Sequence, residues 1–140
     1  MKNILIINGP NLNMLGQRDP ALYGTTTLAD IEAMCRDKAA AMGIAVDFRQ
    51  SNHEGEIVTW IQQARGAVAG LIINAGAYTH TSLAIHDALE LIAAPIVEVH
   101  ITDPKKRESF RHHSYIERLA ALTIAGRGAQ GYLDALDFFA

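Results

Sequence analysis

Cysteine is almost missing from this 140-residue chain, which contains Cys35 alone. A single thiol cannot form a disulfide within the chain, so no disulfide framework holds the fold together. Cys35 shares a helical spacing with Leu28, Ile31 and Met42, which is typical of a buried helix face. We therefore interpret Cys35 as a reduced core residue of a cytoplasmic protein rather than a catalytic nucleophile.

Charge of one sign and long apolar runs are also scarce. Lys and Arg together number 12 against 15 Asp and Glu, a net charge of -3, which argues against the basic face of a nucleic-acid-binding protein. No apolar run approaches the roughly 20 residues of a membrane-spanning helix. The chain also enters a predicted strand directly, without a signal peptide. We expect neither nucleic acid nor membrane as a partner.

Linkers, internal repeats and low-complexity tracts are absent as well. The length therefore predicts a single domain over residues 1–140, large enough to bury its own core. Only 19% of the residues are charged and 49% are hydrophobic. This apolar share indicates subunit interfaces in addition to a core.

The familiar motifs for phosphate-bearing cofactors and metals are missing too. Gly9 and Gly16 do not form a G-x-G-x-x-G turn, and the sequence has no G-x-x-x-x-G-K-[ST] motif. Among six histidines, His112 and His113 are adjacent and do not readily face one ion. No H-E-x-x-H motif or cysteine-rich cluster occurs. We expect a protein that uses neither a metal nor a cofactor.

What the sequence does contain is a regular alternation of short apolar runs and amphipathic segments. Thr27-Leu-Ala-Asp30 has the form of a capping box, and Gly43 follows the helix that this box begins. The segment 103–113 is basic and is expected to be irregular. The pattern predicts strands at 3–8, 45–50, 71–74, 96–100 and 119–125, and helices at 27–42, 53–64, 82–92 and 130–139.

Five strands that alternate with helices predict an α/β fold with a parallel sheet covered on both faces. The simplest winding is the flavodoxin-like strand order 2-1-3-4-5. Ligands of such sheets bind beyond the carboxyl ends of the strands, at the switch point between strands 1 and 3. The sequence places polar residues at three adjacent strand ends: Asn8 with Asn11, Asn74, and Glu98 with His100.

The segment between Gly9 and Gly24 is long for a connection and carries Arg18 and Tyr23, five residues apart. A nearby guanidinium favours the phenolate, so this pair can turn a weak base with a pKa of about 10 into a useful one. A solvated surface loop with a packed tyrosine is the alternative, and this segment alone leaves it open.

His100 ends the fourth predicted strand, and Glu98 lies two residues back on the same side of it. The carboxylate can orient and charge the imidazole. Taken alone, a satisfied strand-end histidine is the simpler interpretation. Opposite Arg18 and Tyr23, however, His100 completes an acid–base pair in which a phenolate takes a proton and an imidazolium gives one.

Several motifs along the chain form a recognisable set, in the order Gly9-Pro-Asn-Leu-Asn13 with Arg18 and Tyr23, Arg49-Gln-Ser-Asn52, Asn74-Ala-Gly-Ala-Tyr-Thr-His-Thr-Ser82, Pro95-Ile-Val-Glu-Val-His-Ile101, Phe110-Arg-His-His-Ser114 and Gly131-Tyr132. This set resembles type II 3-dehydroquinate dehydratase over essentially the whole chain. Two positions depart from the family pattern. Thr102 stands where a serine is common and Asp103 where an asparagine is common, and both keep small polar chemistry.

The resemblance implies conversion of 3-dehydroquinate to 3-dehydroshikimate and water, without a cofactor. This step belongs to the shikimate pathway of aromatic amino acid biosynthesis or to quinate breakdown. The ketone acidifies the neighbouring C–H, so an enolate forms before hydroxide leaves. By similarity Tyr23 is the proton acceptor, which Arg18 keeps ionised, and Arg18 is also the transition-state stabiliser. His100, held by Glu98, is the proton donor, and Asn11 supports the enolate oxygen.

The substrate contacts are likewise implied by the resemblance. Asn74 and the backbone of Ile101 and Thr102 would hold the substrate carboxylate, while His80 and Arg111 would contact its hydroxyl groups.

The family also assembles trimers into a dodecamer, so a homo-oligomer is implied here. Asp87 would reach the site of a neighbouring subunit. A plain surface charge on a helix remains the alternative for Asp87, and the role of Arg107 stays open.

Two other functions can be weighed against this one. A dehydratase that forms a Schiff base needs a lysine in an apolar setting. The four lysines instead precede the first strand, lie on a helix or share a loop that is expected to be exposed: Lys2, Lys38, Lys105 and Lys106. A non-catalytic flavodoxin-like module would need a Ser/Thr-rich phosphate nest for a flavin, or clustered aspartates for a receiver domain. The first loop has asparagines.

Overall fold

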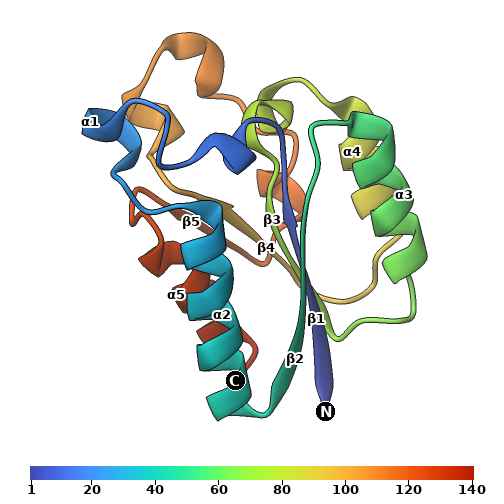
Figure 1. Cartoon of the computed structure of the whole chain (residues 1–140). Coiled ribbons are helices and arrows are strands. Elements are labelled where there is room, and N and C mark those ends of the chain that lie inside the picture. Colours follow the sequence, from blue (N-terminus) through green and yellow to red (C-terminus); the bar gives the residue numbers. More distant parts are fainter.

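The computed structural model describes residues Met1–Ala140 and shows one five-stranded sheet between two layers of helices (Figure 1). Every neighbouring pair of strands is parallel, and the order is β2-β1-β3-β4-β5. The predicted α/β flavodoxin-like fold and its strand order are therefore confirmed. The strands are β1 Lys2–Asn8, β2 Ile44–Gln50, β3 Gly70–Asn74, β4 Ile96–His100 and β5 Leu122–Ala125.

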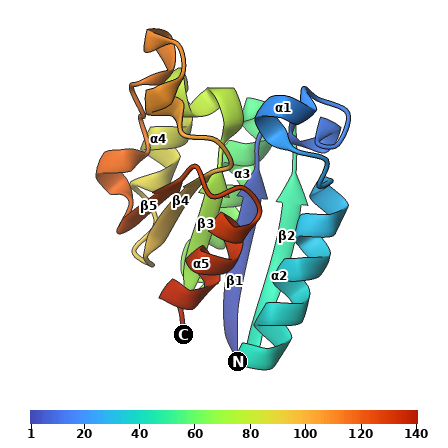
Figure 2. The ribbon, with the colours of Figure 1, turned by 90° about the vertical axis from the view of Figure 1, so that its left-hand side faces the viewer.

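Two pairs of helices cover the two faces of the sheet, as Figures 1 and 2 show. On β1, Ile4 and Ile6 face one core cluster and Leu5 and Ile7 face the other. A strand that is buried on both faces reads as a continuous apolar run, which explains the sequence of β1. One layer consists of α2 Leu28–Met42 and α5 Gln130–Phe138, and the other of α3 Glu54–Ala64 and α4 Leu83–Leu89.

The start of α2 has the predicted capping box. The Thr27 hydroxyl accepts a hydrogen bond from the Asp30 backbone N–H at 3.1 Å, and the Asp30 carboxylate accepts one from the Thr27 N–H at 3.0 Å. Gly43 ends the helix with φ 71°, a left-handed conformation that glycine adopts without strain. Cys35 is fully buried within the core cluster that α2 covers, as predicted.

The bounds of two elements differ from the prediction. The last helical residue of α4 is Leu89 rather than Ile92, because the chain tightens into three-residue turns before Pro95. The fifth strand begins at Leu122 rather than Leu119. Leu119 is the last residue of a 3-10 turn, and the backbone first joins the sheet where the Ala121 N–H donates to the Ile96 carbonyl.

The long first connection also contains a helix that the periodicity did not predict. This helix, α1, spans Pro20–Tyr23, and Asp19 caps it by accepting a hydrogen bond from the Ala21 N–H at 3.1 Å. An aspartate followed by proline at the first helical position is a helix-start signal. The irregular segment 103–113 contains 3-10 turns at Pro104–Lys106 and Ser109–Arg111. No helix in the structure has the length and apolar character that crossing a membrane requires.

Candidate active site

The cavity that holds most of the predicted site residues lies at the carboxyl ends of β1, β3 and β4. In Figures 1 and 2, α1 and the segment around residues 103–113 lie over this end of the sheet, opposite the two termini. The cavity has a volume of about 70 Å³. The predicted residues that line it are Asn11, Arg18, Tyr23, Asn74, His80, His100, Ile101, Thr102 and Arg111.

The turn after β1 brings the first loop against the end of β3. The Gly9 N–H donates to the Asn74 carbonyl at 2.8 Å, and a Cβ on Gly9 would lie 2.2 Å from the Ala75 carbonyl oxygen. Only glycine fits at this position. Asn11 then adopts a left-handed conformation with φ 68°, which asparagine tolerates better than most residues. Its N–H donates to the Asn52 side chain at 3.0 Å, and the Asn11 side chain remains exposed.

Two arginines donate hydrogen bonds to the phenol oxygen of Tyr23. The Arg18 Nη2 donates to the Tyr23 Oη at 2.8 Å, and the guanidinium carbon lies 3.9 Å from the centre of the ring. The Arg107 Nη1 donates to the same oxygen at 3.1 Å. Two fixed cations stabilise negative charge on that oxygen. Sequence reasoning left Arg107 without a role, and its 84-residue separation from Tyr23 gave no local signal.

The predicted pair of His100 and Glu98 is formed. The His100 Nε2 lies 2.8 Å from the Glu98 Oε2, which leaves the imidazole Nδ1 without a partner in the chain. Glu98 is fully buried and lies behind His100, so it does not line the cavity itself. Burial raises the pKa of Glu98, but hydrogen bonds from His100, Ser114 and Thr123 outweigh that effect and hold the pKa below its usual range. The carboxylate is therefore ionised at neutral pH and accepts the hydrogen bond from the His100 Nε2.

Asn74 is fixed by a buried chain of hydrogen bonds. Its Nδ2 donates to the Tyr132 hydroxyl at 2.9 Å, and that hydroxyl donates to the Asn8 Oδ1 at 2.6 Å. Burial raises the pKa of Tyr132, so its hydroxyl stays neutral. Among the sequence motifs, Tyr132 appeared only as part of Gly131-Tyr132. Its hydroxyl also sets the orientation of Asn74.

His80 and Arg111 line the cavity from outside the sheet. The His80 Nδ1 donates to the His113 carbonyl at 2.8 Å, because a carbonyl oxygen can only accept. Burial lowers the pKa of His80, so the ring is neutral near pH 7 and its Nε2 can accept a hydrogen bond. The Arg111 Nε lies 3.3 Å from a Glu108 carboxylate oxygen.

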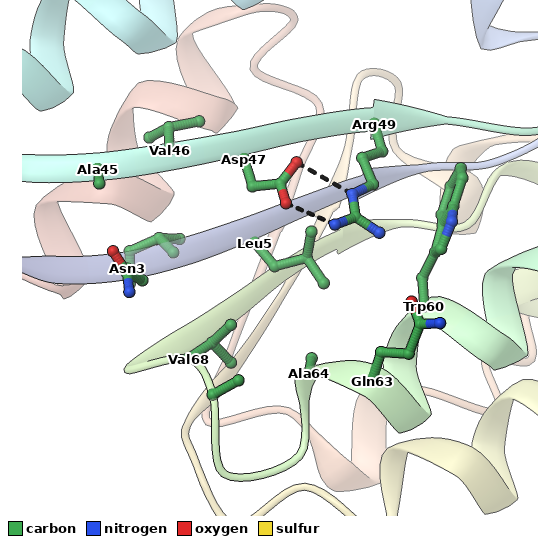
Figure 3. Close-up of a pocket in the computed structure, with 12 residues that line it drawn as sticks. Asn3, Leu5, Ala45, Val46, Asp47, Arg49, Trp60, Gln63, Ala64 and Val68 are labelled. Atoms are coloured by element: carbon green, nitrogen blue, oxygen red, sulfur yellow. Dashed lines mark hydrogen bonds and ion pairs between the residues drawn. The ribbon is translucent and has the colours of Figure 1, made fainter.

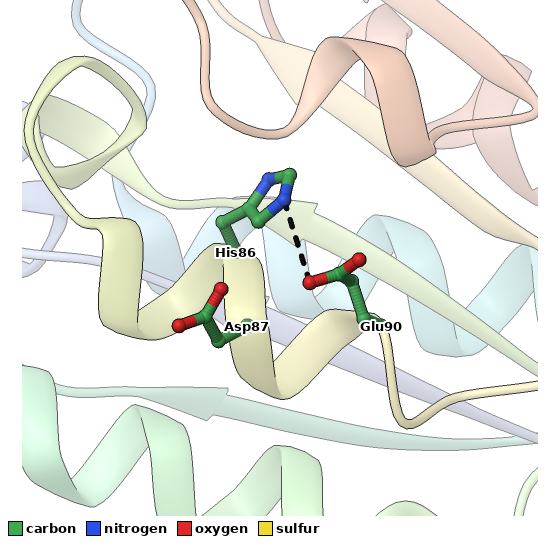
Figure 4. A group of neighbouring side chains, drawn as sticks. All are labelled: His86, Asp87 and Glu90. Carbon is green, nitrogen blue, oxygen red and sulfur yellow. Dashed lines mark ion pairs between the residues drawn. The ribbon is translucent and has the colours of Figure 1, made fainter.

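Asp87 is the one predicted site residue that lies away from this region. It is exposed on α4, where its carboxylate, His86 and Glu90 have ligand atoms within 4.8 Å of one another (Figure 4). The His86 Nδ1 contacts the Tyr115 carbonyl at 2.5 Å, and its Nε2 lies 3.6 Å from Glu90. Motif reasoning did not identify this group. Both carboxylates are exposed, and exposed acidic groups commonly lie together without an ion, so we assign no metal to it.

A second hollow, a groove of about 320 Å³, lies between β2 and α3 (Figure 3). Within β2, Arg49 makes two bonds to Asp47, at 3.0 and 2.6 Å, and its guanidinium carbon lies 5.4 Å from the centre of the Trp60 ring on α3. Arg49 lowers the pKa of Asp47, so the carboxylate stays ionised and paired. This groove offers no unpaired acid or base. The chemistry is concentrated at the strand ends.

The family model for class II dehydroquinases matches residues 2–140. The chain belongs to the class II dehydroquinase family. The "3-dehydroquinate dehydratase 2" of Pseudomonas putida is 54% identical over 137 residues, which are 98% of this chain and 92% of that protein. The "3-dehydroquinate dehydratase" of Streptomyces avermitilis is 58% identical over 135 residues, 96% of this chain and 85% of that protein.

Solved structures of class II dehydroquinases show the same fold. The type II dehydroquinase from Propionibacterium acnes superposes with a TM-score of 0.96 at 42% identity and covers 99% of this chain and 96% of its own. The type II dehydroquinase from Butyrivibrio crossotus gives a TM-score of 0.95, also at 42% identity, with 98% and 96% covered. The family predicted from the sequence motifs is thereby confirmed.

Proposed function

We propose that Tyr23 and His100 are the base and the acid with which this class II dehydroquinase converts 3-dehydroquinate to 3-dehydroshikimate and water. Family membership supports the reaction and its place in the shikimate pathway. The observation that carries the assignment of residues is the pair of guanidinium donors on the Tyr23 oxygen, in the same cavity as His100. The flavin-binding alternative has no support from the relatives.

The proposed base is the Tyr23 phenolate. In the first step Tyr23 takes a proton from the carbon beside the substrate ketone, and the electron pair of that C–H bond moves to form an enolate. Arg18 and Arg107 both donate to the Tyr23 oxygen, so they stabilise its negative charge before the proton moves. Asn11 has an exposed side chain at the cavity with which to donate to the enolate oxygen.

The acid acts in the second step. The enolate re-forms the ketone and expels the hydroxyl group on the neighbouring ring carbon, which leaves as water with a proton from His100. Glu98 holds His100 by its Nε2, so the Nδ1 is the nitrogen that gives this proton. Turnover leaves one proton on Tyr23 and removes one from His100, and exchange with solvent restores both. The net reaction consumes no cofactor.

The remaining residues bind the substrate. In our proposal Asn74 and the backbone of Ile101 and Thr102 hold the substrate carboxylate. The hydroxyl of the buried Tyr132 accepts a hydrogen bond from the Asn74 amide and so fixes its orientation. His80 and Arg111 contact the ring hydroxyls from the opposite wall. A neutral His80 with its Nδ1 bonded to His113 presents its Nε2 as an acceptor for a hydroxyl proton.

We further propose a homo-oligomer, a dodecamer built from trimers, in which Asp87 completes the site of a neighbouring subunit. Asp87 and Leu83 are four residues apart on α4 and share one helix face, and Leu83 is 56% exposed. A subunit that covers Leu83 would also meet Asp87. Leu91, Leu122 and Phe110 are exposed as well and leave further apolar surface to cover.

We propose the cytoplasm as the location and the whole chain as one catalytic domain. The location is supported by Cys35, the one cysteine of the chain, which is a free thiol as is usual for proteins of reducing compartments. The domain proposal is supported by the single sheet, to which segments from Lys2 to Ala125 contribute strands.

An ultraviolet assay tests the proposed reaction. Adding 3-dehydroquinate to the purified protein should produce the absorbance of the conjugated product, 3-dehydroshikimate. Activity should persist with a metal chelator, and borohydride with substrate should leave no covalent adduct on a lysine. Folded protein that yields no product would refute the reaction, and a trapped lysine adduct would refute the acid–base route.

A further inference from the structure

The carboxylate of Glu98 has more partners than its role in holding His100 requires. Its Oε2 accepts from the His100 Nε2 at 2.8 Å and from the Ser114 Oγ at 2.7 Å, and its Oε1 accepts from the Thr123 Oγ1 at 3.1 Å. The two hydroxyls come from outside β4, one from the loop before β5 and one from β5 itself. Both carboxylate oxygens are thereby fixed in place.

Ser114 can act only as a donor toward Glu98. Its Oγ accepts from the backbone N–H groups of Ile116 and Glu117, each at 3.1 Å. A serine hydroxyl has two acceptor lone pairs and one proton. Because both lone pairs are used, the proton is committed to the Glu98 Oε2. The 3-10 turn that follows Ser114 therefore sets the direction of this hydrogen bond.

Thr123 reaches Glu98 through the register of the sheet. Glu98 and Thr123 are paired across β4 and β5, so their side chains lie side by side on one face. The hydroxyl approaches the oxygen that His100 does not use. Thr123 is an exposed residue on the edge strand, and the rest of its side chain has no polar role.

We propose that Ser114 and Thr123 are positioning residues for the dehydration reaction, which fix the Glu98 carboxylate so that it holds the His100 imidazole turned toward the substrate. Neither residue lines the cavity that contains Tyr23, so both act through Glu98. This inference rests on the function proposed above. It adds the two hydroxyls as a support for the proton donor.

The two hydroxyls act against the effect of burial on Glu98. Burial raises the pKa of this carboxyl, and hydrogen bonds from His100, Ser114 and Thr123 bring it down. Removing either hydroxyl should move the titration midpoint of Glu98 to higher pH. A cavity of about 350 Å³ adjoins the site. The other titratable groups that line it are unchanged in every variant compared: His80, Asp103, Lys105, Arg111, His112 and Glu117.

Steady-state kinetics provide the first test. We expect Thr123→Val to lower kcat about fivefold and Ser114→Ala about tenfold, with KM changed less than about twofold, because the lost bond supports a group that acts in the transition state. Thr123→Ser keeps the hydroxyl and should restore kcat. Thr59→Val is the matched control, since the Thr59 hydroxyl bonds only to the Gly55 carbonyl on α3.

Carboxyl ¹³C NMR of protein labelled at glutamate provides a readout that a merely structural role would not move. The Glu98 resonance, assigned from its loss in Glu98→Gln, should titrate at higher pH in Thr123→Val than in wild type. In Thr123→Ser the midpoint should return toward the wild-type value. This measurement needs no substrate and so is independent of the proposed reaction.

The outcomes separate the two proposals. Wild-type protein without dehydratase activity would refute the proposed function, whereas an active wild type with unaltered Thr123→Val would refute the present inference. Ser114→Ala also leaves two backbone N–H groups without an acceptor. If that variant fails to fold, the Thr123→Val and Thr123→Ser pair decides the inference by both kcat and the Glu98 midpoint.

Discussion

The phenol of Tyr23 is the base in our proposal, and two guanidinium groups contact its oxygen. Arg18 and Arg107 come from segments 89 positions apart in the sequence, yet both donate to the same oxygen. The Arg18 guanidinium carbon also lies 3.9 Å from the centre of the Tyr23 ring, which is closer than anchoring the loop would require. This arrangement supports the proposed role of Tyr23 as the base.

Substitution of the arginines tests whether they act through Tyr23. Arg18→Ala should lower kcat about 100-fold, as loss of one donor to a catalytic oxyanion does. Combined with Tyr23→Phe it should be little worse than Tyr23→Phe alone, because residues that act as a unit are not additive. Arg18→Lys keeps the charge without the planar fork and should recover only part of the rate. Additive losses in the double variant would show that Arg18 serves another group.

Glu98 makes stability depend on pH in a defined direction. Its folded-state pKa lies below that of the unfolded chain, so its contribution is fully present above the unfolded value of about 4.3 and is lost as pH falls through the lower folded value. Glu98→Gln should therefore have a lower free energy of unfolding than wild type at pH 7. This difference in unfolding free energy should become smaller below about pH 4. Urea unfolding at one protein concentration measures this.

The control for this measurement is Glu56→Gln, which removes an exposed carboxylate on α3. The difference in unfolding free energy between Glu56→Gln and wild type should be small and should change little with pH. A Glu98→Gln difference that stayed constant between pH 3 and 7 would contradict the assigned direction of the Glu98 shift.

At the scale of elements, α1 and the residues before it form the cover of the cavity. Gly16 and Gly24 flank this segment with φ of 89° and 74°, which allows the backbone to turn sharply at both ends. We predict that a bound substrate analogue slows tryptic cleavage after Arg18, because closure would fix the segment and hide the bond. Cleavage after Arg65, on the far side of the molecule at the end of α3, is the internal control. Equal rates at Arg18 with and without analogue would exclude closure.

The elements also show how far sequence reasoning reaches. Periodicity placed β1 and β4 and the parallel sheet, because strands buried on both faces leave continuous apolar runs. It extended the fifth strand back to Leu119, because an apolar run does not reveal where a 3-10 turn gives way to ladder hydrogen bonds. It found the pair of Glu98 and His100 from period-two spacing. It could not predict the hydrogen bond from Arg107 to the Tyr23 oxygen, because only tertiary folding brings these two residues together.

At the scale of the whole molecule, the account requires that subunits share sites. Asp87 is exposed on α4 and does not line the cavity of its own subunit, so its proposed role requires a neighbouring subunit. Light scattering should therefore report about twelve times the 15.2 kDa chain mass, the size of the proposed dodecamer. A fully active monomer would contradict shared sites.

Mixing two defective variants tests the sharing directly. Tyr23→Phe subunits carry an intact Asp87, and Asp87→Asn subunits carry an intact Tyr23. If both parents are slow and the sites are shared, dissociating and reassembling a mixture should create some complete sites and regain activity. A mixture no faster than the average of its parents would place Asp87 outside the site.

The central claim is that the Tyr23 phenolate removes the substrate proton, and turnover by Tyr23→Phe tests it most directly. This substitution removes one oxygen and keeps the ring. Measured by the ultraviolet absorbance of the product, kcat should fall about 1,000-fold or more, as loss of a general base does. The Kd of a substrate analogue should change less than about threefold, because the lost interaction belongs to the transition state. Turnover close to that of the wild type would contradict the account and place the base on another residue.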